Sequence, residues 1–416
     1  MYQKTILPSG IKVISEEIPH SHSVSVGFWV RTGSRDESAE ENGSAHFLEH
    51  LAFKGTQRRG PGDLAREIDQ LGGSANAFTS KENTCFHGRV LADQLPRLID
   101  LLSDILLNPV YQPEELERER QVILQEILTQ EDSPEDYIHE LFSLRYWGEN
   151  PFGRPITGSV ETVRQLTRTG LLNYRQDTYR PEQLVIAAAG RLQHQELVDL
   201  VSPYFERFRN GRPPRQRLLV STSTGVHFFP RDLEQVHVCL GTPAPWAADP
   251  DHYVAIVLNL ILGGNMSSRL FQEVREKRAL CYAIYSFFSS YSDTGLLAVN
   301  AAVGPENLKT LLEIIRIELN RLAEQEISDQ ELQAAQEYLR RSLYLSAEDN
   351  DNRMIRLARN EINFGCYIPY EEIIAHLQAV TAPQINRLAQ KLFDPSNWTR
   401  VFLGPMTEND IPQELQ

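Results

Sequence analysis

Residues 43–56 read Gly-Ser-Ala-His-Phe-Leu-Glu-His-Leu-Ala-Phe-Lys-Gly-Thr and place two histidines and a glutamate within five positions. Residues four apart in a helix lie on nearly the same face. His46 and His50 would therefore project two imidazoles side by side, with Glu49 next to them. Paired histidines also occur as ordinary packing or surface residues. The polar, acidic residues before the motif and Gly55 after it favour a metal-binding helix.

A hydrolytic zinc site needs three protein ligands and one open position. Zinc lowers the pKa of a bound water to about 7, and a carboxylate can accept the proton as that water attacks a carbonyl group. His46 and His50 would supply two ligands and Glu49 the base. The helix predicted over residues 113–130 offers Glu119 and Glu126, seven apart on one face, for the third ligand. Spacing leaves three further acids of that helix open: Glu114, Glu115 and Glu117.

The chain has 416 residues, enough for at least two domains. Its hydrophobic content of 41% is that of an ordinary protein with a buried core. The net charge of −15 argues against nucleic-acid binding, which needs a basic surface. An acidic surface would favour basic peptides as substrates.

Four widely spaced cysteines indicate neither a disulfide framework nor a cysteine zinc site. The N-terminal residues lack the continuous apolar segment of a signal peptide. The longest apolar stretch, residues 253–262, is too short to span a bilayer. We therefore expect a soluble cytoplasmic protein without a membrane span.

Strand and helix patterns follow one another in runs rather than in strict alternation, which is typical of α+β folds. Residues 209–225 are rich in Pro, Gly, Ser, Thr and Arg without apolar periodicity, as in a linker. This linker separates a zinc-bearing first domain, residues 1–208, from a metal-free second domain, residues 226–416. We expect two homologous domains, each a mostly antiparallel sheet packed with helices.

The two halves look like distant repeats. Segment 95–106 is similar in pattern to segment 308–319, and each follows two predicted strands. Each also precedes a helix that opens with Glu-Leu, at residues 115–116 and 331–332. The second half has no His-x-x-Glu-His segment, so we expect only the first domain to bind metal.

The inverted motif of residues 46–50 resembles that of the pitrilysin-type (M16) metallopeptidases, which are inverzincins. The likeness continues through four further segments of the chain: 72–80, 117–126, 151–155 and 266–272. The length is similar to that of the half-size branch, which contains the mitochondrial processing peptidase subunits and their bacterial relatives. The resemblance implies two α+β domains of similar topology, with one Zn²⁺ per chain.

The resemblance also implies roles for particular residues. It places the third zinc ligand at Glu126 and an outer-shell acid at Glu119, where a carboxylate would orient a ligand. Asn76 and Ala77 match the edge-strand segment that holds the substrate backbone by added strand pairing.

Arg275 and Tyr282 match a pair that assists substrate binding and transition-state stabilisation. Composition alone would make Arg275 a surface residue and Tyr282 a core aromatic. In relatives this pair faces the zinc site across a chamber formed by two chains. The resemblance thus implies a homodimer with a composite active site.

We therefore predict a zinc metalloendopeptidase that hydrolyses peptides or unfolded polypeptide segments, with Glu49 assisting the attack of zinc-bound water. The alternative is a non-catalytic assembly or partner subunit of a related heteromeric peptidase or respiratory complex. Such subunits normally lose a ligand or the base, whereas this chain retains His46, His50, Glu49 and Glu126.

Overall fold

The computed structural model describes residues 1–206, 208, 215–325 and 327–407. Contacts divide the chain into two compact units, each assembled from three stretches of sequence. Unit 1 consists of Met1–Thr129, Arg154–Leu218 and Leu345–Tyr367; unit 2 consists of Gln130–Gly153, Leu219–Tyr344 and Ile368–Gln416.

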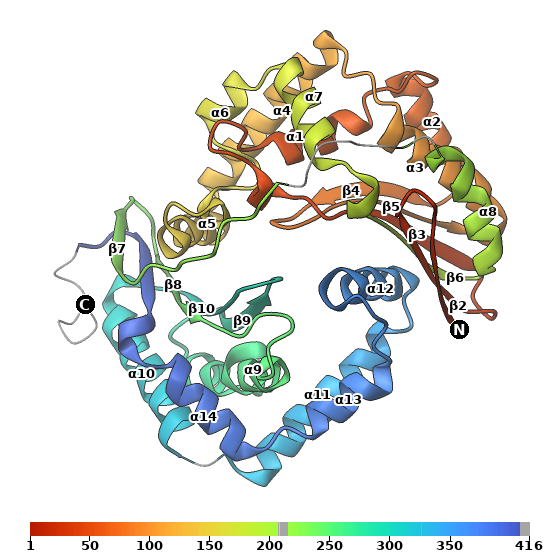
Figure 1. Ribbon diagram of the computed structural model, residues 1–416. Coiled ribbons are helices and arrows are strands. Elements are labelled where there is room, and N and C mark those ends of the chain that lie inside the picture. Colours follow the sequence, from red (N-terminus) through yellow and green to blue (C-terminus); the bar gives the residue numbers. More distant parts are fainter. Residues whose placement is uncertain (207, 209–214, 326, 408–416) are drawn as a thin grey trace. The chain divides into compact units, whose positions relative to one another are not determined.

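Unit 1 contains a six-stranded sheet in the order β1-β2-β6-β3-β5-β4 (Figure 1). Its strands are β1 (Tyr2–Ile6), β2 (Lys12–Glu17), β3 (Ser23–Val30), β4 (Ser74–Thr79), β5 (Thr84–Leu91) and β6 (Leu184–Gly190). β2 and β6 run parallel, and the other neighbours are antiparallel. The central strands β3 and β6 are apolar and almost completely buried, as expected for strands covered on both faces. β4 forms one edge and pairs with β5 alone among the described strands.

Helices cover this sheet, and one of them carries the His-x-x-Glu-His motif. They are α1 (Ser44–Ala52), α2 (Pro61–Gln70), α3 (Leu95–Leu107), α6 (Val160–Gln165), α7 (Arg168–Thr178), α8 (His194–Phe205), α12 (Asn350–Phe364) and most of α4 (Pro113–Asp132). α3 packs its apolar stripe on β5 and β3, and α8 packs beside it against β2. α1, α4 and α7 share a separate apolar cluster, which fixes the motif helix against its neighbours.

Unit 2 contains a five-stranded sheet in the order β7-β11-β8-β10-β9. Its strands are β7 (Gly225–Pro230), β8 (Val236–Pro243), β9 (Ile284–Ser290), β10 (Gly295–Val303) and β11 (Thr399–Gly404). Its helices are α5 (Pro134–Trp147), α9 (His252–Asn259), α10 (Leu308–Glu324), α13 (Tyr370–Gln378), α14 (Ala382–Leu392) and most of α11 (Asp329–Ser346). Two π-helical turns, Leu260–Gly264 and Phe271–Glu276, follow α9.

The two sheets have the same topology. The order β2-β6-β3-β5-β4 in unit 1 corresponds strand for strand to β7-β11-β8-β10-β9 in unit 2. In both sheets the first of these pairs is parallel and the rest are antiparallel. α3 and α10, which contain the similar sequence segments, each follow the matching pair of strands. The predicted fold class of two similar α+β domains is confirmed.

The repeats exchange one helix each. α5 follows α4 in the chain but packs on β8 and β11 of unit 2, whereas α12 follows α11 but packs on β3 and β6 of unit 1. A glycine lies under each helix. A Cβ on Gly27 of β3 would lie 2.5 Å from Sδ of Met354, and a Cβ on Gly241 of β8 would overlap the ring of Phe142. Because β3 and β8 are corresponding strands, the exchange is reciprocal.

The chain passes from unit 1 to unit 2 between Leu218 and Leu219, within the stretch expected to be a linker. Residues 215–224 contain neither helix nor strand, and residues 209–214 lie outside the described residues. From the sequence, each domain is expected to be one continuous stretch of chain. By contacts, however, residues 130–153 belong to unit 2 and residues 345–367 belong to unit 1. In the described part of the chain, no helix is both long and apolar enough to cross a membrane.

Candidate metal centre

Helix α1 begins at a turn that requires glycine. Gly43 has φ of 95°, in the left-handed region, and a Cβ there would lie 2.8 Å from the carbonyl oxygen of Thr157. The first amides of a helix have no partner inside it. The buried carboxylate of Glu37 accepts two amides at this end, from Gly43 at 2.9 Å and from Ala45 at 2.7 Å.

The two faces of α1 differ in character. Ala45, Phe47, Leu48 and Leu51 are buried in the cluster shared with α4 and α7. The remaining face carries the polar groups of residues 46, 49 and 50. Since the apolar residues lock the helix in one rotation about its axis, the two imidazoles are held in one direction.

α4 brings two carboxylates to the imidazoles. The helix starts at Pro113, which suits a first helical position because proline lacks an amide hydrogen. Buried Arg120 places its guanidinium 5.5 Å from the ring centroid of Phe47 in α1 and donates a 2.8 Å hydrogen bond to the carbonyl of Leu166. These contacts align α4 with α1.

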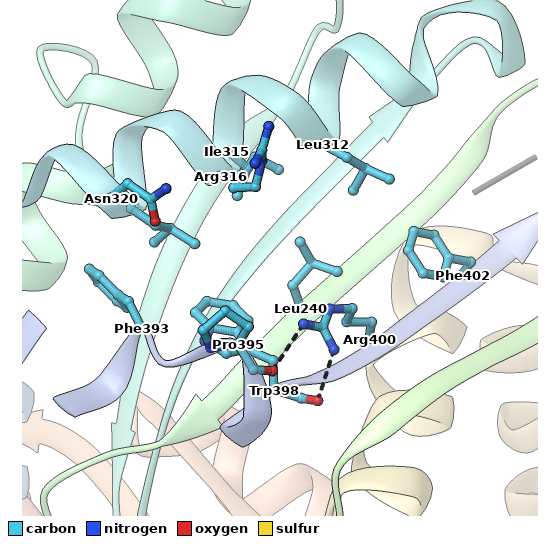
Figure 2. Close-up of a pocket in the computed structure, with 11 residues that line it drawn as sticks. Leu240, Leu312, Ile315, Arg316, Asn320, Phe393, Pro395, Trp398, Arg400 and Phe402 are labelled. Atoms are coloured by element: carbon cyan, nitrogen blue, oxygen red, sulfur yellow. Dashed lines mark hydrogen bonds between the residues drawn. The ribbon is translucent and has the colours of Figure 1, made fainter. Parts of the chain in front are cut away.

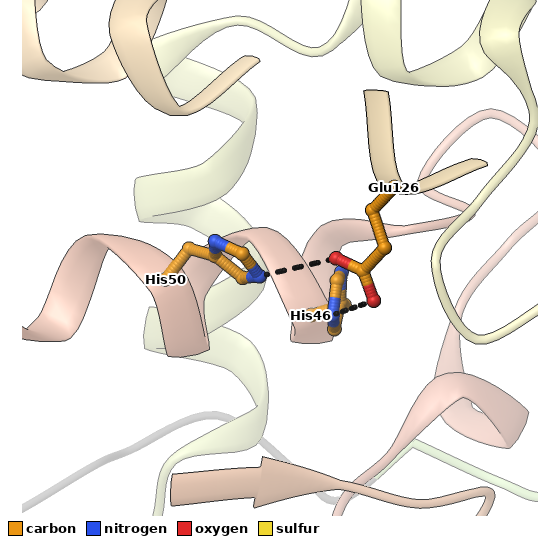
Figure 3. Close-up of side chains that lie close together, drawn as sticks. All are labelled: His46, His50 and Glu126. Atoms are coloured by element: carbon orange, nitrogen blue, oxygen red, sulfur yellow. Dashed lines mark ion pairs between the residues drawn. The ribbon is translucent and has the colours of Figure 1, made fainter. Parts of the chain in front are cut away.

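His46, His50 and Glu126 converge, as Figure 3 shows. Nε2 of His46 lies 3.7 Å from Oε1 of Glu126, and Nε2 of His50 lies 3.6 Å from Oε2 of the same carboxylate. One donor atom from each of the three residues lies within 4.8 Å of the other two. Among the described residues, this is the one group of three or more histidine, cysteine or acidic side chains with such spacing.

Of the other acids of α4, Glu119 contacts the opposite nitrogen of His50, whereas Glu115 and Glu117 pair with arginines. Oε2 of Glu119 lies 3.1 Å from Nδ1 of His50, and Oε1 of Glu119 lies 2.8 Å from Nζ of Lys54. Glu115 pairs with Arg118, and Glu117 pairs with Arg120 at 3.0 Å.

The environment sets the charge of the histidines. Burial and the neighbouring His50 lower the pKa of His46 to about 4, so His46 is neutral at neutral pH. Burial also disfavours the charged form of His50, but hydrogen bonds to Glu126 and Glu119 outweigh it and raise the pKa of His50. Hydrogen bonding to His50 lowers the pKa of Glu126, which keeps this carboxylate ionised.

Glu49 of α1 lies next to the edge strand β4. Burial raises the pKa of Glu49, an effect that the neighbouring Thr79 of β4 partly offsets. Its Oε2 atom is buried without a hydrogen-bond partner among the described residues. A buried acid with a free oxygen and a raised pKa is suited to proton transfer.

Asn76 and Ala77 lie in the middle of β4, opposite His87 and Phe86 of β5. The Asn76 side chain is exposed, whereas Ala77 is buried. Oδ1 of Asn76 accepts a 2.9 Å hydrogen bond from the amide of Ala77. Thr79, which interacts with Glu49, lies on the same strand. Glu49 is therefore close to the edge strand of the sheet.

Arg275 and Tyr282 belong to unit 2 and lie next to each other. The Arg275 guanidinium carbon is 4.9 Å from the ring centroid of Tyr282 and 4.8 Å from that of Phe271. Tyr282 is 82% exposed, and so it is not the core aromatic that composition alone would suggest. The exposed ring and the partly buried guanidinium form one patch.

A pocket of about 80 Å³ in unit 2 lies between α10 and β8 (Figure 2). Arg400 donates hydrogen bonds to the carbonyls of Pro395 and Trp398 on its wall. Asn320, Arg316 and Arg400 are its polar side chains, and the described residues that line it include no acid, histidine, cysteine or hydroxyl group. This pocket therefore lacks groups for metal binding or proton transfer.

Sequence reasoning did not find Glu37 or Arg120. Glu37 stands in an acidic run that looks like a solvated loop, yet its side chain is buried. Arg120 stands in the charged segment Glu117-Arg-Glu-Arg and looks like a surface residue. The sequence offers one hint for each residue. Glu37 lies shortly before the motif, and Arg120 lies on the helix that carries Glu126.

By its fold and its inverted motif, the protein is an α+β protein of two similar units with one candidate metal centre among the described residues. Two family models match the chain: "Insulinase (Peptidase family M16)" over residues 12–160 and "Peptidase M16 inactive domain" over residues 165–339. The chain belongs to peptidase family M16.

Curated relatives match the chain along its whole length. An "Uncharacterized zinc protease" of Mycobacterium tuberculosis is 39% identical over 420 residues, covering 100% of this chain and 96% of the relative. The "Uncharacterized zinc protease YmxG" of Bacillus subtilis is 36% identical and covers 94% of this chain and 96% of the relative. The crystal structure of a protease from Helicobacter pylori has the same fold, with a TM-score of 0.91, 21% identity and coverage of 97% of this chain and 99% of that chain.

Proposed function

We propose that the protein is a zinc-dependent endopeptidase that cleaves peptides or unfolded segments. The observation that carries this proposal is the convergence of Nε2 of His46, Nε2 of His50 and the Glu126 carboxylate beside the buried Glu49. The names of the curated relatives, which are zinc proteases, support a metalloprotease in general.

The three residues fit zinc by number, type and spacing. Zinc–ligand bonds of about 2.0–2.1 Å at tetrahedral angles separate neighbouring ligand atoms by roughly 3.3 Å. Nε2 of each imidazole lies 3.6–3.7 Å from a different oxygen of Glu126, and one donor atom from each residue lies within 4.8 Å of the other two, so the side chains must close further to share one ion. His46 supplies a neutral nitrogen and Glu126 an ionised oxygen, which suits one Zn²⁺ per chain with one position left open.

Zinc, when bound, polarises a carbonyl oxygen and makes water more acidic. Glu49 then acts as the base, because burial raises its pKa and makes the carboxylate a stronger proton acceptor than an exposed glutamate. Its free Oε2 accepts a proton from the attacking water and afterwards delivers it to the departing amine. Glu119 holds Nδ1 of His50, which directs Nε2 of that ring toward Glu126.

The substrate is proposed to bind as an added strand along β4. An edge strand offers main-chain hydrogen bonds to an extended peptide whatever its sequence. Asn76 already covers the Ala77 amide with its side-chain oxygen, and a peptide carbonyl would replace that oxygen. Such binding would suit peptides and unfolded segments, with basic ones favoured by the net charge of −15.

Arg275 and Tyr282 are proposed to donate hydrogen bonds to the oxyanion that develops at the scissile carbonyl. The exposure of Tyr282 supports a role outside the core. We propose that the pair comes from a second copy of the chain, in a homodimer with a composite active site. Localisation in the cytoplasm remains our expectation.

The test is digestion of a peptide library with mass-spectrometric readout, using wild-type protein and Glu49→Gln after zinc loading. We expect cleavage by the wild type, loss of cleavage with a chelator, and a loss of about 10²–10⁴-fold in Glu49→Gln. Metal analysis should find zinc in both proteins. A wild-type protein that binds zinc but cleaves no peptide would support the alternative of a non-catalytic partner subunit, and full activity of Glu49→Gln would reject the role of Glu49.

A further inference from the structure

The segment before the metal helix contains a buried acid that the proposed chemistry does not use. Glu37 is only 3% exposed. Its Oε1 accepts from the amide of Ala45 at 2.7 Å, and its Oε2 accepts from the amide of Gly43 at 2.9 Å and from Nδ2 of Asn42 at 3.1 Å. Burial raises the pKa of Glu37, but both of its oxygens accept hydrogen bonds from N–H donors, an arrangement that suits the ionised form.

This carboxylate is placed to hold the start of α1. Glu37 accepts a hydrogen bond from the amide nitrogen of Ala45, and Ala45 is the residue directly before His46. Both carboxylate oxygens act as acceptors at a helix N-terminus, where negative charge is favoured. A glutamine would present an NH₂ group to N–H donors on one side. An aspartate is one methylene shorter and would not reach both amides.

The segment that leads out of unit 1 fastens the loop that carries Glu37. Arg215 binds Glu41 at 2.5 Å and Asp177 at 3.1 Å. Arg217 binds Asp36 at 2.8 Å and Glu82 at 3.0 Å. Asp36 and Glu41 flank Glu37 in the chain, so the two arginines fix the loop on both sides of the buried acid.

A further contact reaches the backbone of Glu37 itself. Arg154 donates a 2.9 Å hydrogen bond to the carbonyl of Glu37, and Lys81 donates a 2.7 Å hydrogen bond to the carbonyl of Arg154. The loop is therefore held through its backbone, through its flanking acids and through the buried carboxylate. A metal site needs its ligands within about 0.5 Å of the productive geometry, and such a supporting shell provides that precision.

We infer that Glu37 is a positioning residue for the metal site, acting through the N-terminus of α1, and that Arg215 and Arg217 of the interdomain segment hold its loop in place. This inference rests on the proposed metal site but not on peptide cleavage. It assigns a role to a segment whose composition is that of a passive linker. A displacement of residues 215–217 would be transmitted to His46 through Glu37.

The test compares metal binding in Glu37→Gln with that in Glu40→Gln. Glu40 is an exposed acid of the same loop, so its substitution removes an equal charge without touching α1. Dissociation constants for Zn²⁺ are measured by chelator competition, and the visible spectrum of the Co²⁺-loaded protein reports ligand geometry. We expect about 10–100-fold weaker zinc binding and an altered Co²⁺ spectrum in Glu37→Gln, with Glu40→Gln unchanged. Equal dissociation constants for Glu37→Gln and wild type would overturn the inference, as would equal weakening in Glu40→Gln.

A second variant covers the case in which Glu37→Gln does not fold. Arg217→Gln removes the partly exposed guanidinium that binds Asp36 and Glu82 and leaves the apolar core untouched. We expect its zinc dissociation constant to rise several-fold and its Co²⁺ spectrum to shift in the same direction. An unchanged metal site in Arg217→Gln would remove the interdomain segment from the inference. If the wild type binds zinc but cleaves nothing, the proposed function fails while these binding measurements still decide the role of Glu37.

Discussion

Oε2 of Glu119 lies 3.1 Å from Nδ1 of His50, on the ring nitrogen that does not face Glu126. A carboxylate at Nδ1 favours the tautomer with the proton on that nitrogen, because only an N–H can donate to it. In that tautomer Nε2 keeps its lone pair for a metal ion that Glu126 would also bind. Lys54, at 2.8 Å from the other oxygen of Glu119, stabilises the charge of this carboxylate.

Substitution Glu119→Gln should weaken zinc binding by about 10–100-fold, since the fixed tautomer and orientation of His50 are lost. Chelator competition measures the effect. Glu114→Gln is the matched control, because Glu114 is an exposed acid of the same helix. Zinc binding that is equally strong in both variants would contradict the role given to Glu119.

A composite site predicts complementation between two inactive variants. Glu49→Gln lacks the base and Tyr282→Phe lacks the phenol, so each alone should cleave peptides poorly. Mixed dimers would contain one site with both wild-type groups, because each variant supplies what the other lacks. We expect activity to rise toward roughly a quarter of the wild-type value after the subunits are mixed and exchanged, an estimate from random pairing. If native mass spectrometry finds mixed dimers that remain inactive, the two groups do not meet across a subunit interface.

The loop after α1 is tied to α3 by Asp104, whose side chain is completely buried. Burial opposes ionisation of Asp104, but hydrogen bonds from Thr56, Asn108, Arg59 and Arg58 outweigh it and lower the pKa. The stabilisation is therefore fully present above the ordinary pKa of 3.8 and is lost as pH falls through the lowered value.

Asp104→Asn should accordingly destabilise the protein by about 3 kcal/mol at neutral pH, because Arg58 and Arg59 lose the buried carboxylate that they share. Thermal unfolding of wild type and variant from pH 8 to pH 3 measures this difference. We expect it to be constant above pH 5 and to shrink below pH 4. Asp69→Asn, at an exposed position of α2, should leave the unfolding temperature unchanged throughout.

Helix α12 stabilises unit 1 although it follows unit 2 in sequence. Leu357→Ala removes a side chain that is 1% exposed and should cost about 2–5 kcal/mol. Hydrogen exchange followed by mass spectrometry should show faster exchange in β3 and β6, on which α12 packs, and little change in β8 and β10. The exposed substitution Ile317→Ala serves as the control. Faster exchange confined to the strands of unit 2 would contradict the assignment of α12.

The local pattern of the chain predicts much of the fold. The sequence pattern predicts strands over residues 74–80 and 84–91, and these agree with β4 and β5 within one residue. The edge strand β1 and the inner strand β11 were not predicted. β1 is mostly exposed, and so it shows little apolar alternation. The helix exchange was not predicted either, because periodicity identifies the apolar face of α12 but not the sheet that this face covers.

The candidate site shows the same limit. Helical spacing places His46 and His50 on one face, but the choice between Glu119 and Glu126 depends on how α4 lies against α1. That arrangement depends on contacts distant in sequence, such as Arg120 over the ring of Phe47. Glu37 was missed for a related reason, since burial of an acid in a polar loop follows from tertiary contacts.

The reciprocal exchange of α5 and α12 has a consequence for how the protein is made. Ribosomes add about 5–20 residues per second, so roughly ten seconds or more separate completion of β6 at Gly190 from completion of α12 at Phe364. During that interval Ile14, Trp29 and Val185 lack the helix that buries them. The nascent N-terminal sheet therefore exposes an apolar surface that is prone to aggregation. The duration of this exposure is set by the position of α12 in the sequence rather than by the folding rate of the sheet.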